Sequence, residues 1–260
     1  MDLKLKGKVA IVTGGAKGIG AGISEALATE GAKLAIATRV SDEASQFIEK
    51  MKKITDVLVI PGDVSKLDQC KKIVEDTVAH FGHLDILINN AGVNDGVSLA
   101  DDPEKFINSL HINLVHLFAL AHHSVPHLKK TNGNILNIGS KVSATGQGNT
   151  SGYAASKGGC DALTREWALD LRDDGVRVNC LIPAECLTPQ YESWLKTLDN
   201  AEETIDKVNK LIPFGRRMTT IKELGNTAAF VCSDLSSHTT GQILFVDGGY
   251  THLDRKCTVD

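Results

Sequence analysis

Short apolar runs alternate along the chain with longer segments of helical periodicity. The runs are rich in β-branched residues and predict strands near residues 9–12, 34–38, 57–60, 86–88, 134–138, 176–181 and 242–246. Apolar residues spaced three to four apart predict helices near residues 19–31, 47–54, 73–81, 106–128, 152–173 and 222–232. The 106–128 pattern is that of one long helix, and residues 183–217 show no strand pattern.

This alternation predicts a parallel sheet with helices on both faces. We expect an α/β fold with about seven strands, doubly wound as one domain over residues 1–260, and a substrate loop near residues 183–217. The chain shows no repeat of solenoid length and no linker between domains. Ligands of such sheets bind beyond the carboxyl ends of the strands, so the side chains that follow each strand are the first candidates for a site.

Composition and charge exclude several partners. A net charge of −4 without a basic cluster gives no reason to expect nucleic acid or an anionic membrane. No apolar run is long enough for a transmembrane helix, and none precedes the first strand as in a signal peptide. The six cysteines form no C-x-x-C pair. We therefore expect reduced thiols, no metal site and a cytoplasmic protein.

A glycine-rich turn directly follows the first strand. Its sequence, TGGAKGIG at residues 13–20, lets the backbone turn sharply and approach a pyrophosphate. The helix that follows presents free N–H groups to such an anion. The turn predicts a dinucleotide site with the candidate residues Gly14, Lys17, Gly18, Ile19 and Gly20.

Two later turns extend this site. Asp63 follows the third strand and is either an acceptor for an adenine amino group or a helix N-cap. The run from Asn89 to Gly92 follows the fourth strand, and its asparagines are either cofactor ligands or turn residues. The candidates for cofactor binding here are Asp63, Val64, Asn90, Ala91 and Gly92.

The end of the second strand bears on the choice between NAD and NADP. A carboxylate there would bond the ribose 2′-hydroxyl, but the chain has Arg39 and no carboxylate until Asp42. Arg39 and Lys17 together can hold a 2′-phosphate. The alternative is that both are solvated surface charges. We expect NADP as the preferred cofactor, with NAD as the alternative.

Tyr153 and Lys157 lie four residues apart in a predicted helix and so share a face. A nearby ammonium and an oxidised nicotinamide favour the phenolate form of tyrosine. The phenolate can take the proton of a substrate hydroxyl while the cofactor takes a hydride from carbon. Ser140, just after the fifth strand, can donate to the same oxygen. Y-x-x-x-K alone is a common pattern, and it also fits a surface pair without a catalytic role.

Taken in order, these motifs resemble those of the short-chain dehydrogenase/reductase family over the whole chain. The glycine turn matches T-G-x-x-x-G-x-G, residues 89–92 match N-N-A-G, and Ser140 precedes Tyr153 at the family's spacing. The resemblance implies a Rossmann fold, NAD(P) chemistry and a homotetramer or homodimer. It implies the catalytic set Asn113, Ser140, Tyr153 and Lys157, in which Asn113 holds a water of a proton relay. It further implies cofactor contacts from Tyr153, Lys157, Pro183, Cys186 and Thr188.

The residues expected around a substrate are polar. The candidates for substrate binding are Asn94, Ser140, Gln147, Tyr153, Glu185 and Trp194. Such a wall suits a polyhydroxylated substrate better than a steroid or fatty acyl chain. The alternative is that several of these side chains face water or cap turns.

Several segments, among them residues 146–153, 172–179 and 248–255, resemble bacterial L-fucose dehydrogenases. In that subgroup Ala184 takes the place of the family's usual glycine after Pro183. The resemblance implies hydride transfer from C1 of an aldose, L-fucose or a similar sugar, to NAD(P), giving the lactone. A carbonyl reductase for 3-oxoacyl or steroid substrates, and a non-catalytic NAD(P)-sensing protein, are the alternatives. The tail after Gly249 either folds over the pocket, docks on a neighbouring subunit or frays.

Overall fold

The computed structural model describes residues 2–253, so Asp254, Arg255 and Cys257 lie outside the described residues. Within this range the chain forms one parallel sheet of seven strands in the order β3-β2-β1-β4-β5-β6-β7. The strands are β1 (Val9–Thr13), β2 (Lys33–Thr38), β3 (Val57–Pro61), β4 (Ile86–Asn89), β5 (Asn134–Ile138), β6 (Arg177–Pro183) and β7 (Ile243–Val246). This order confirms the predicted doubly wound sheet, whose switch point lies between β1 and β4.

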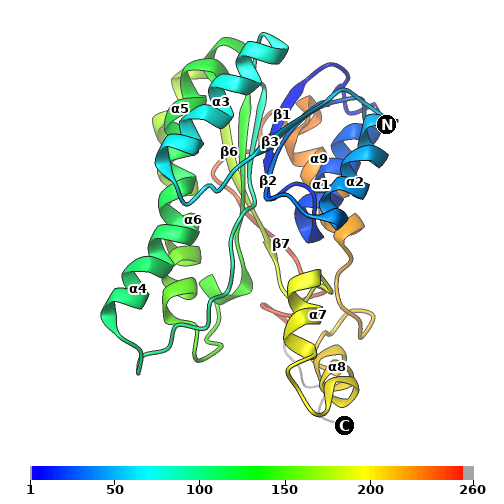
Figure 1. The fold of residues 1–260 in the computed structure, drawn as a ribbon, viewed down its shortest axis with the longest axis vertical. Helices are drawn as coiled ribbons and strands as arrows, with labels where there is room; N and C mark the ends of the chain where they lie inside the picture. Colours follow the sequence, from blue (N-terminus) through cyan, green and yellow to red (C-terminus); the bar gives the residue numbers. More distant parts are fainter. Residues whose placement is uncertain (1, 254–260) are drawn as a thin grey trace.

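Helices cover both faces of the sheet (Figure 1). One face carries α1 (Gly18–Thr29), α2 (Asp42–Lys52) and α9 (Ile221–Cys232), and the other carries α3 (Leu67–Phe81), α5 (His116–Thr131) and α6 (Ser151–Asp170). Two hydrophobic clusters fill the two interfaces between helices and sheet. Because both faces are covered, β1 is buried at every position, which explains its uninterrupted apolar run.

The helix predicted over residues 106–128 is correct in place but not in form. It consists of α4 (Pro103–Leu110), a π-helical turn (His111–Val115) and α5, which follow one another without a loop. A π turn inserts one residue into the helical repeat and is often found at functional sites. Apolar spacing cannot reveal it, because the helical pattern continues on both sides of the turn.

The segment 183–217, expected as a loop, contains α7 (Pro189–Leu195) and α8 (Ala201–Lys210). Both lie together beyond the carboxyl end of β6 (Figure 1). Thr188 caps α7 by accepting the N–H of Tyr191 at 3.3 Å, and Pro189 fits the first helical position. In α8, acidic residues in the first turn and lysines in the last complement the helix dipole. Local capping and charge therefore form two short helices where the apolar pattern is weak.

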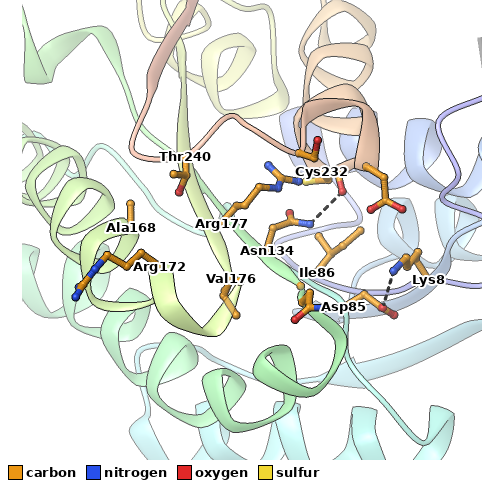
Figure 2. A pocket seen from close by; sticks show the side chains of 15 residues that line it. Lys8, Asp85, Ile86, Asn134, Ala168, Arg172, Val176, Arg177, Cys232 and Thr240 are labelled. Carbon is orange, nitrogen blue, oxygen red and sulfur yellow. Dashed lines mark hydrogen bonds and ion pairs between the residues drawn. The ribbon is translucent and has the colours of Figure 1, made fainter.

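A cavity of about 370 Å³ lies at the amino ends of the strands (Figure 2). Its polar side chains are committed to structural contacts. Asp85 accepts the N–H of Val9 at 2.8 Å and pairs with Lys8 at 3.2 Å. Arg177 donates to three backbone carbonyls and one hydroxyl. Ligands of parallel α/β sheets bind at the opposite, carboxyl ends of the strands.

Candidate active site

The glycine turn after β1 has the conformation that a phosphate-binding turn needs. Gly14 and Gly18 have φ values of +61° and +51°, which side chains disfavour. An added Cβ at Gly20 would collide with the carbonyl of Gly14. Helix α1 begins at Gly18, and its N-cap Lys17 makes no side-chain capping bond. Free N–H groups at this end of the helix therefore fit the pyrophosphate of a dinucleotide.

Thr13 joins this turn to the loop after β4. Its hydroxyl accepts the N–H groups of Asn90 and Ala91, each at 3.0 Å, and donates to the carbonyl of Ile88 at 3.2 Å. The Asn90 side chain returns a bond to the Thr13 carbonyl at 2.8 Å. The structure thus brings together two loops that the sequence analysis proposed separately. Thr13 itself was not among the predicted site residues, although it begins the turn motif.

The residues predicted to hold a 2′-phosphate lie at the surface. Arg39 is exposed at the end of β2. Lys17 pairs with Glu43, on the first turn of α2, at 2.8 Å between Nζ and Oε2. Both side chains of this pair are largely exposed, at 41% and 53%, as the alternative of solvated surface charges expects, and a phosphate would have to compete with the Glu43 carboxylate for Lys17.

Asp63 is not a helix N-cap, since α3 begins at Leu67 after Lys66. Its carboxylate instead accepts the N–H of Ser65 at 3.0 Å. This hydrogen bonding lowers the pKa of Asp63. The exposed, ionised carboxylate at the end of β3 keeps acceptor capacity for an amino group.

Lys157 is a buried cation at the centre of the predicted catalytic set. The residue is 3% exposed, and its ammonium donates to the carbonyl of Ile138 at 2.7 Å. The Lys157 ammonium lies 5.5 Å from the ring centroid of Tyr153, and Tyr153 precedes Lys157 by one turn of α6. No carboxylate pairs with Lys157 within residues 2–253. A buried ammonium needs acceptors for its remaining donors, and the ribose hydroxyls of a bound nucleotide would supply them.

Asn113 lies in the π turn and faces the same place. Its Oδ1 accepts the N–H of Val93 at 2.8 Å, while its buried Nδ2 has no protein partner among the described residues. A Cβ added at Gly92 would lie 3.2 Å from Asn113 Oδ1 and 3.7 Å from Lys157 Nζ. Asn113 and Lys157 thus converge on Gly92, and the orphaned Nδ2 suits the expected water relay.

Ser140 lies two residues after the end of β5 and caps a short 3₁₀ turn (Lys141–Ser143). Its hydroxyl accepts the N–H of Val142 at only 3.5 Å, so the bond is weak and the group is available to a ligand. The residue is half-buried, as is Tyr153. Lys157, on α6, donates to the carbonyl of Ile138, the last residue of β5. This bond holds the end of β5 against α6.

The predicted substrate residues do not form one group. Glu185 is buried and Asn94 is half-buried, whereas Gln147 is exposed and Trp194 is 45% exposed. Asn94 accepts the N–H of Gly96 at 3.3 Å, as in the turn-capping alternative. Glu185 is the candidate with the strongest contacts, because its carboxylate pairs with Lys141 and its charge, after burial, raises the pKa of the nearby Tyr191 phenol.

The loop after β6 lies against the glycine turn. Thr188 is close to Gly18, with 3.3 Å between the threonine Cβ and a Cβ added at the glycine. Cys186 is buried, and burial raises the pKa of its thiol to about 12. Its side chain therefore stays a neutral thiol, and any contact with a nicotinamide carboxamide falls to its backbone. Pro183 is the last residue of β6 and is buried.

Two buried groups near Lys157 were missed from the sequence. His116 is fully buried, and neither ring nitrogen has a hydrogen-bond partner among the residues that the structure describes. Burial and the charge of Lys157 lower its pKa to about 3. Cys160, Asp161 and Cys180 place their ligand atoms within 4.8 Å of one another. Cys180 donates to Asp161 at 3.6 Å.

A parallel doubly wound sheet, a phosphate-binding turn and a buried lysine beside a tyrosine define a nucleotide-dependent oxidoreductase. A family model described as Enoyl-(Acyl carrier protein) reductase matches residues 14–251. The chain belongs to the short-chain dehydrogenase/reductase family. Within residues 2–253, no helix is both long and apolar enough to cross a membrane.

Comparisons with individual proteins agree with this family. The chain is 36% identical over 249 residues to L-fucose dehydrogenase of Mus musculus, covering 95% of this chain and 89% of that protein. It is 44% identical to the crystallised Cj0485 dehydrogenase, with a TM-score of 0.93 and 98% of each chain covered. L-Sorbose reductase from Gluconobacter frateurii, solved with NADPH and L-sorbose, is 28% identical with a TM-score of 0.93, covering 98% of this chain and 100% of that one.

Proposed function

We propose that this oxidoreductase is an aldose 1-dehydrogenase that passes a hydride from C1 of L-fucose or a similar sugar to NAD(P) and releases the lactone. The buried carboxylate of Glu185 carries this proposal. Together with Lys141 and Tyr191 it presents donors and acceptors after Ser140 and Pro183, where a steroid or acyl chain would need apolar surface. Polyhydroxylated substrates satisfy such groups, and apolar ones leave them unpaired.

The relatives support a sugar substrate. L-fucose dehydrogenase of the mouse and L-sorbose reductase are both named for sugars. A relative named 3-oxoacyl-[acyl-carrier-protein] reductase, from Thermotoga maritima and 35% identical over 251 residues, instead favours the alternative, a reductase of 3-oxoacyl or steroid carbonyls. A non-catalytic NAD(P)-sensing protein has no need of the tyrosine–lysine pair at the site.

The residues of the site divide the chemistry among them. The Tyr153 phenolate takes the proton of the C1 hydroxyl as the C1–H bond breaks, and the carbonyl of the lactone forms. The oxidised nicotinamide, when bound, accepts the hydride. Ser140 donates to the reacting oxygen. Lys157, 5.5 Å from the Tyr153 ring centroid, binds the ribose, while Asn113 holds a water that carries the proton onward from Lys157.

We also propose NADP as the preferred cofactor. Arg39 is exposed at the end of β2, where no carboxylate competes for a ribose hydroxyl. Backbone N–H groups of the turn at Gly18 and Ile19 would hold the pyrophosphate, whereas the N–H of Gly14 donates to the carbonyl of Ala37 at 2.8 Å. Lys17 supports a 2′-phosphate only when it leaves Glu43.

A further proposal is that the enzyme is a homodimer or homotetramer. Ile107, Phe118 and Leu169 are 56%, 57% and 61% exposed, on α4, α5 and α6. The Phe118 ring lies 6.4 Å from the ring of Trp167, so α5 and α6 share one apolar face. A second copy of this face would cover these side chains. Light scattering that gives a monomer at micromolar concentration would contradict this.

The function is tested by incubating the purified enzyme with NADP or NAD and a panel of aldoses, acyl thioesters and steroids. Absorbance of the reduced nicotinamide should rise with aldoses, and most with L-fucose or a close relative. Tyr153→Phe should lower kcat on the order of 1000-fold while nucleotide affinity stays within a few-fold. Turnover of acyl thioesters or steroids alone would favour the alternative reductase. Nucleotide binding without turnover of any substrate would favour the sensing protein.

A further inference from the structure

Lys141 and Glu185 form a nearly buried ion pair at the substrate end of the sheet. Their side chains are 12% and 11% exposed. Lys141 directly follows Ser140, and Glu185 comes two residues after the end of β6. Because β5 and β6 are neighbouring strands, the pair lies across the two loops that flank the reacting hydroxyl.

Two tyrosines frame this pair. Tyr191, on α7, lies close to the Glu185 carboxylate, and burial, together with this charge, raises the pKa of the Tyr191 phenol. The Lys141 ammonium lies over the Tyr250 ring, 4.3 Å from its centroid. Tyr250 directly follows Gly249, so the described part of the chain after β7 also reaches the substrate end. Four separate segments of the chain thus meet at one charged pair.

Stability alone does not explain such a pair. Removing two charges from water costs more than a surface ion pair returns, and apolar residues of similar volume often stabilise a fold better. The chain has thirteen other ion pairs among the described residues, and in each of them at least one side chain is more than 30% exposed. The position beside Ser140 makes a role in substrate recognition the better account.

We propose that Lys141 and Glu185, framed by Tyr191 and Tyr250, form a subsite that binds the ring hydroxyls of a neutral sugar and discriminates against anionic sugars. This rests on the proposed sugar substrate and adds the residues that select it. A hydroxyl both donates and accepts, and it therefore suits a carboxylate placed next to an ammonium. Lys141 has three donors and Glu185 about four acceptor positions, of which the contacts above use only part.

The sign of each charge makes the proposal specific. With both charges present the subsite is neutral overall. The attraction of a sugar acid to Lys141 is then offset by its repulsion from Glu185. Loss of the carboxylate leaves an uncompensated ammonium, which favours an anionic sugar. Loss of the ammonium leaves an uncompensated carboxylate, which repels an anionic sugar. A purely structural pair would not change substrate preference in opposite directions.

The experiment compares kcat/KM for an accepted aldohexose with kcat/KM for the matching hexuronic acid at low salt. Glu185→Gln should lower the ratio of aldose to acid by about tenfold or more, and Lys141→Met should raise it. The double variant, which removes both charges, should return the ratio toward the wild-type value while kcat/KM for the aldose stays low. Asp174→Asn and Lys129→Met break an exposed ion pair elsewhere and serve as matched controls.

Equal changes for aldose and acid in both single variants would overturn the subsite, even if the wild type oxidises aldoses well. A wild type that turns over no aldose would instead overturn the proposed function, whatever the variants do. Nucleotide affinity and thermal unfolding identify a variant that fails to fold. If a single variant fails to fold, the double variant is compared with the wild type, because it keeps no unpaired buried charge. An unchanged kcat/KM for the aldose in the double variant would reject the subsite.

Discussion

Asn113 accepts the N–H of Val93 through Oδ1 at 2.8 Å, and this bond ties the π turn to the loop after β4. The π turn thus has an identifiable consequence for the site. It places a buried side chain of the α4–α5 helix against Gly92, where the Lys157 ammonium also lies. The loop after β4 is therefore held at two points. Asn113 binds the N–H of Val93, and Thr13, at the end of β1, binds two further N–H groups of the loop.

We predict that Asn113→Ala lowers kcat on the order of 10- to 100-fold, because the Val93 N–H loses its acceptor and the relay loses its amide. The free energy of unfolding should fall by about 1–3 kcal/mol. Nucleotide affinity should change much less than kcat, since the phosphate-binding turn is untouched. Steady-state kinetics, nucleotide titration and denaturant unfolding measure these three effects. The exposed Asn108→Ala on α4 is the control, and an equal loss of kcat in both variants would reject the role of Asn113.

The Lys17–Glu43 pair leads to a prediction about cofactor choice. Glu43→Gln frees Lys17 and removes a negative charge near the expected 2′-phosphate, so the Kd for NADP should fall about two- to fivefold. Arg39→Ala should raise it about tenfold, and neither change should alter the Kd for NAD. Fluorescence titrations with both nucleotides measure this. Glu49→Gln, an exposed change on the same helix, is the control. Parallel shifts for NAD and NADP would show that these residues do not contact the phosphate.

The sheet and the glycine turn could be predicted because their signals are local. Apolar runs mark buried parallel strands, and glycines mark the turn where positive φ is required. Contacts between distant segments leave no such signal. The partner of Glu185 is 44 residues away, at Lys141, and neither spacing nor composition points to it. The burial of His116 and the exposure of Gln147 likewise depend on tertiary packing, since both residues are polar within ordinary local patterns.

The close approach of α1 and α9 leads to a prediction about stability. A Cβ at Gly22 would collide with the backbone carbonyl of Ile221, which cannot rotate away as a side chain could. Gly22→Ala should therefore lower the free energy of unfolding by about 1–3 kcal/mol. Gly146, with open space around its Cβ position and no positive φ, is the matched control, and its alanine variant should stay within about 0.5 kcal/mol. Similar stability of the two variants in urea would contradict the packing argument.

The buried His116 predicts how stability depends on pH. Its pKa is lowered from 6.5 to about 3 in the folded chain, first by burial and then by the charge of Lys157. Between these values the unfolded chain binds a proton that the folded chain does not, so acid favours unfolding. From pH 7 to pH 5 this residue should cost the fold about 2 kcal/mol. His116→Leu should remove that part of the pH dependence, whereas His122→Leu, at an exposed position on the same helix, should keep it. Urea unfolding at the two pH values measures the difference, and equal pH slopes in the wild type and His116→Leu would show that the buried imidazole does not titrate as described.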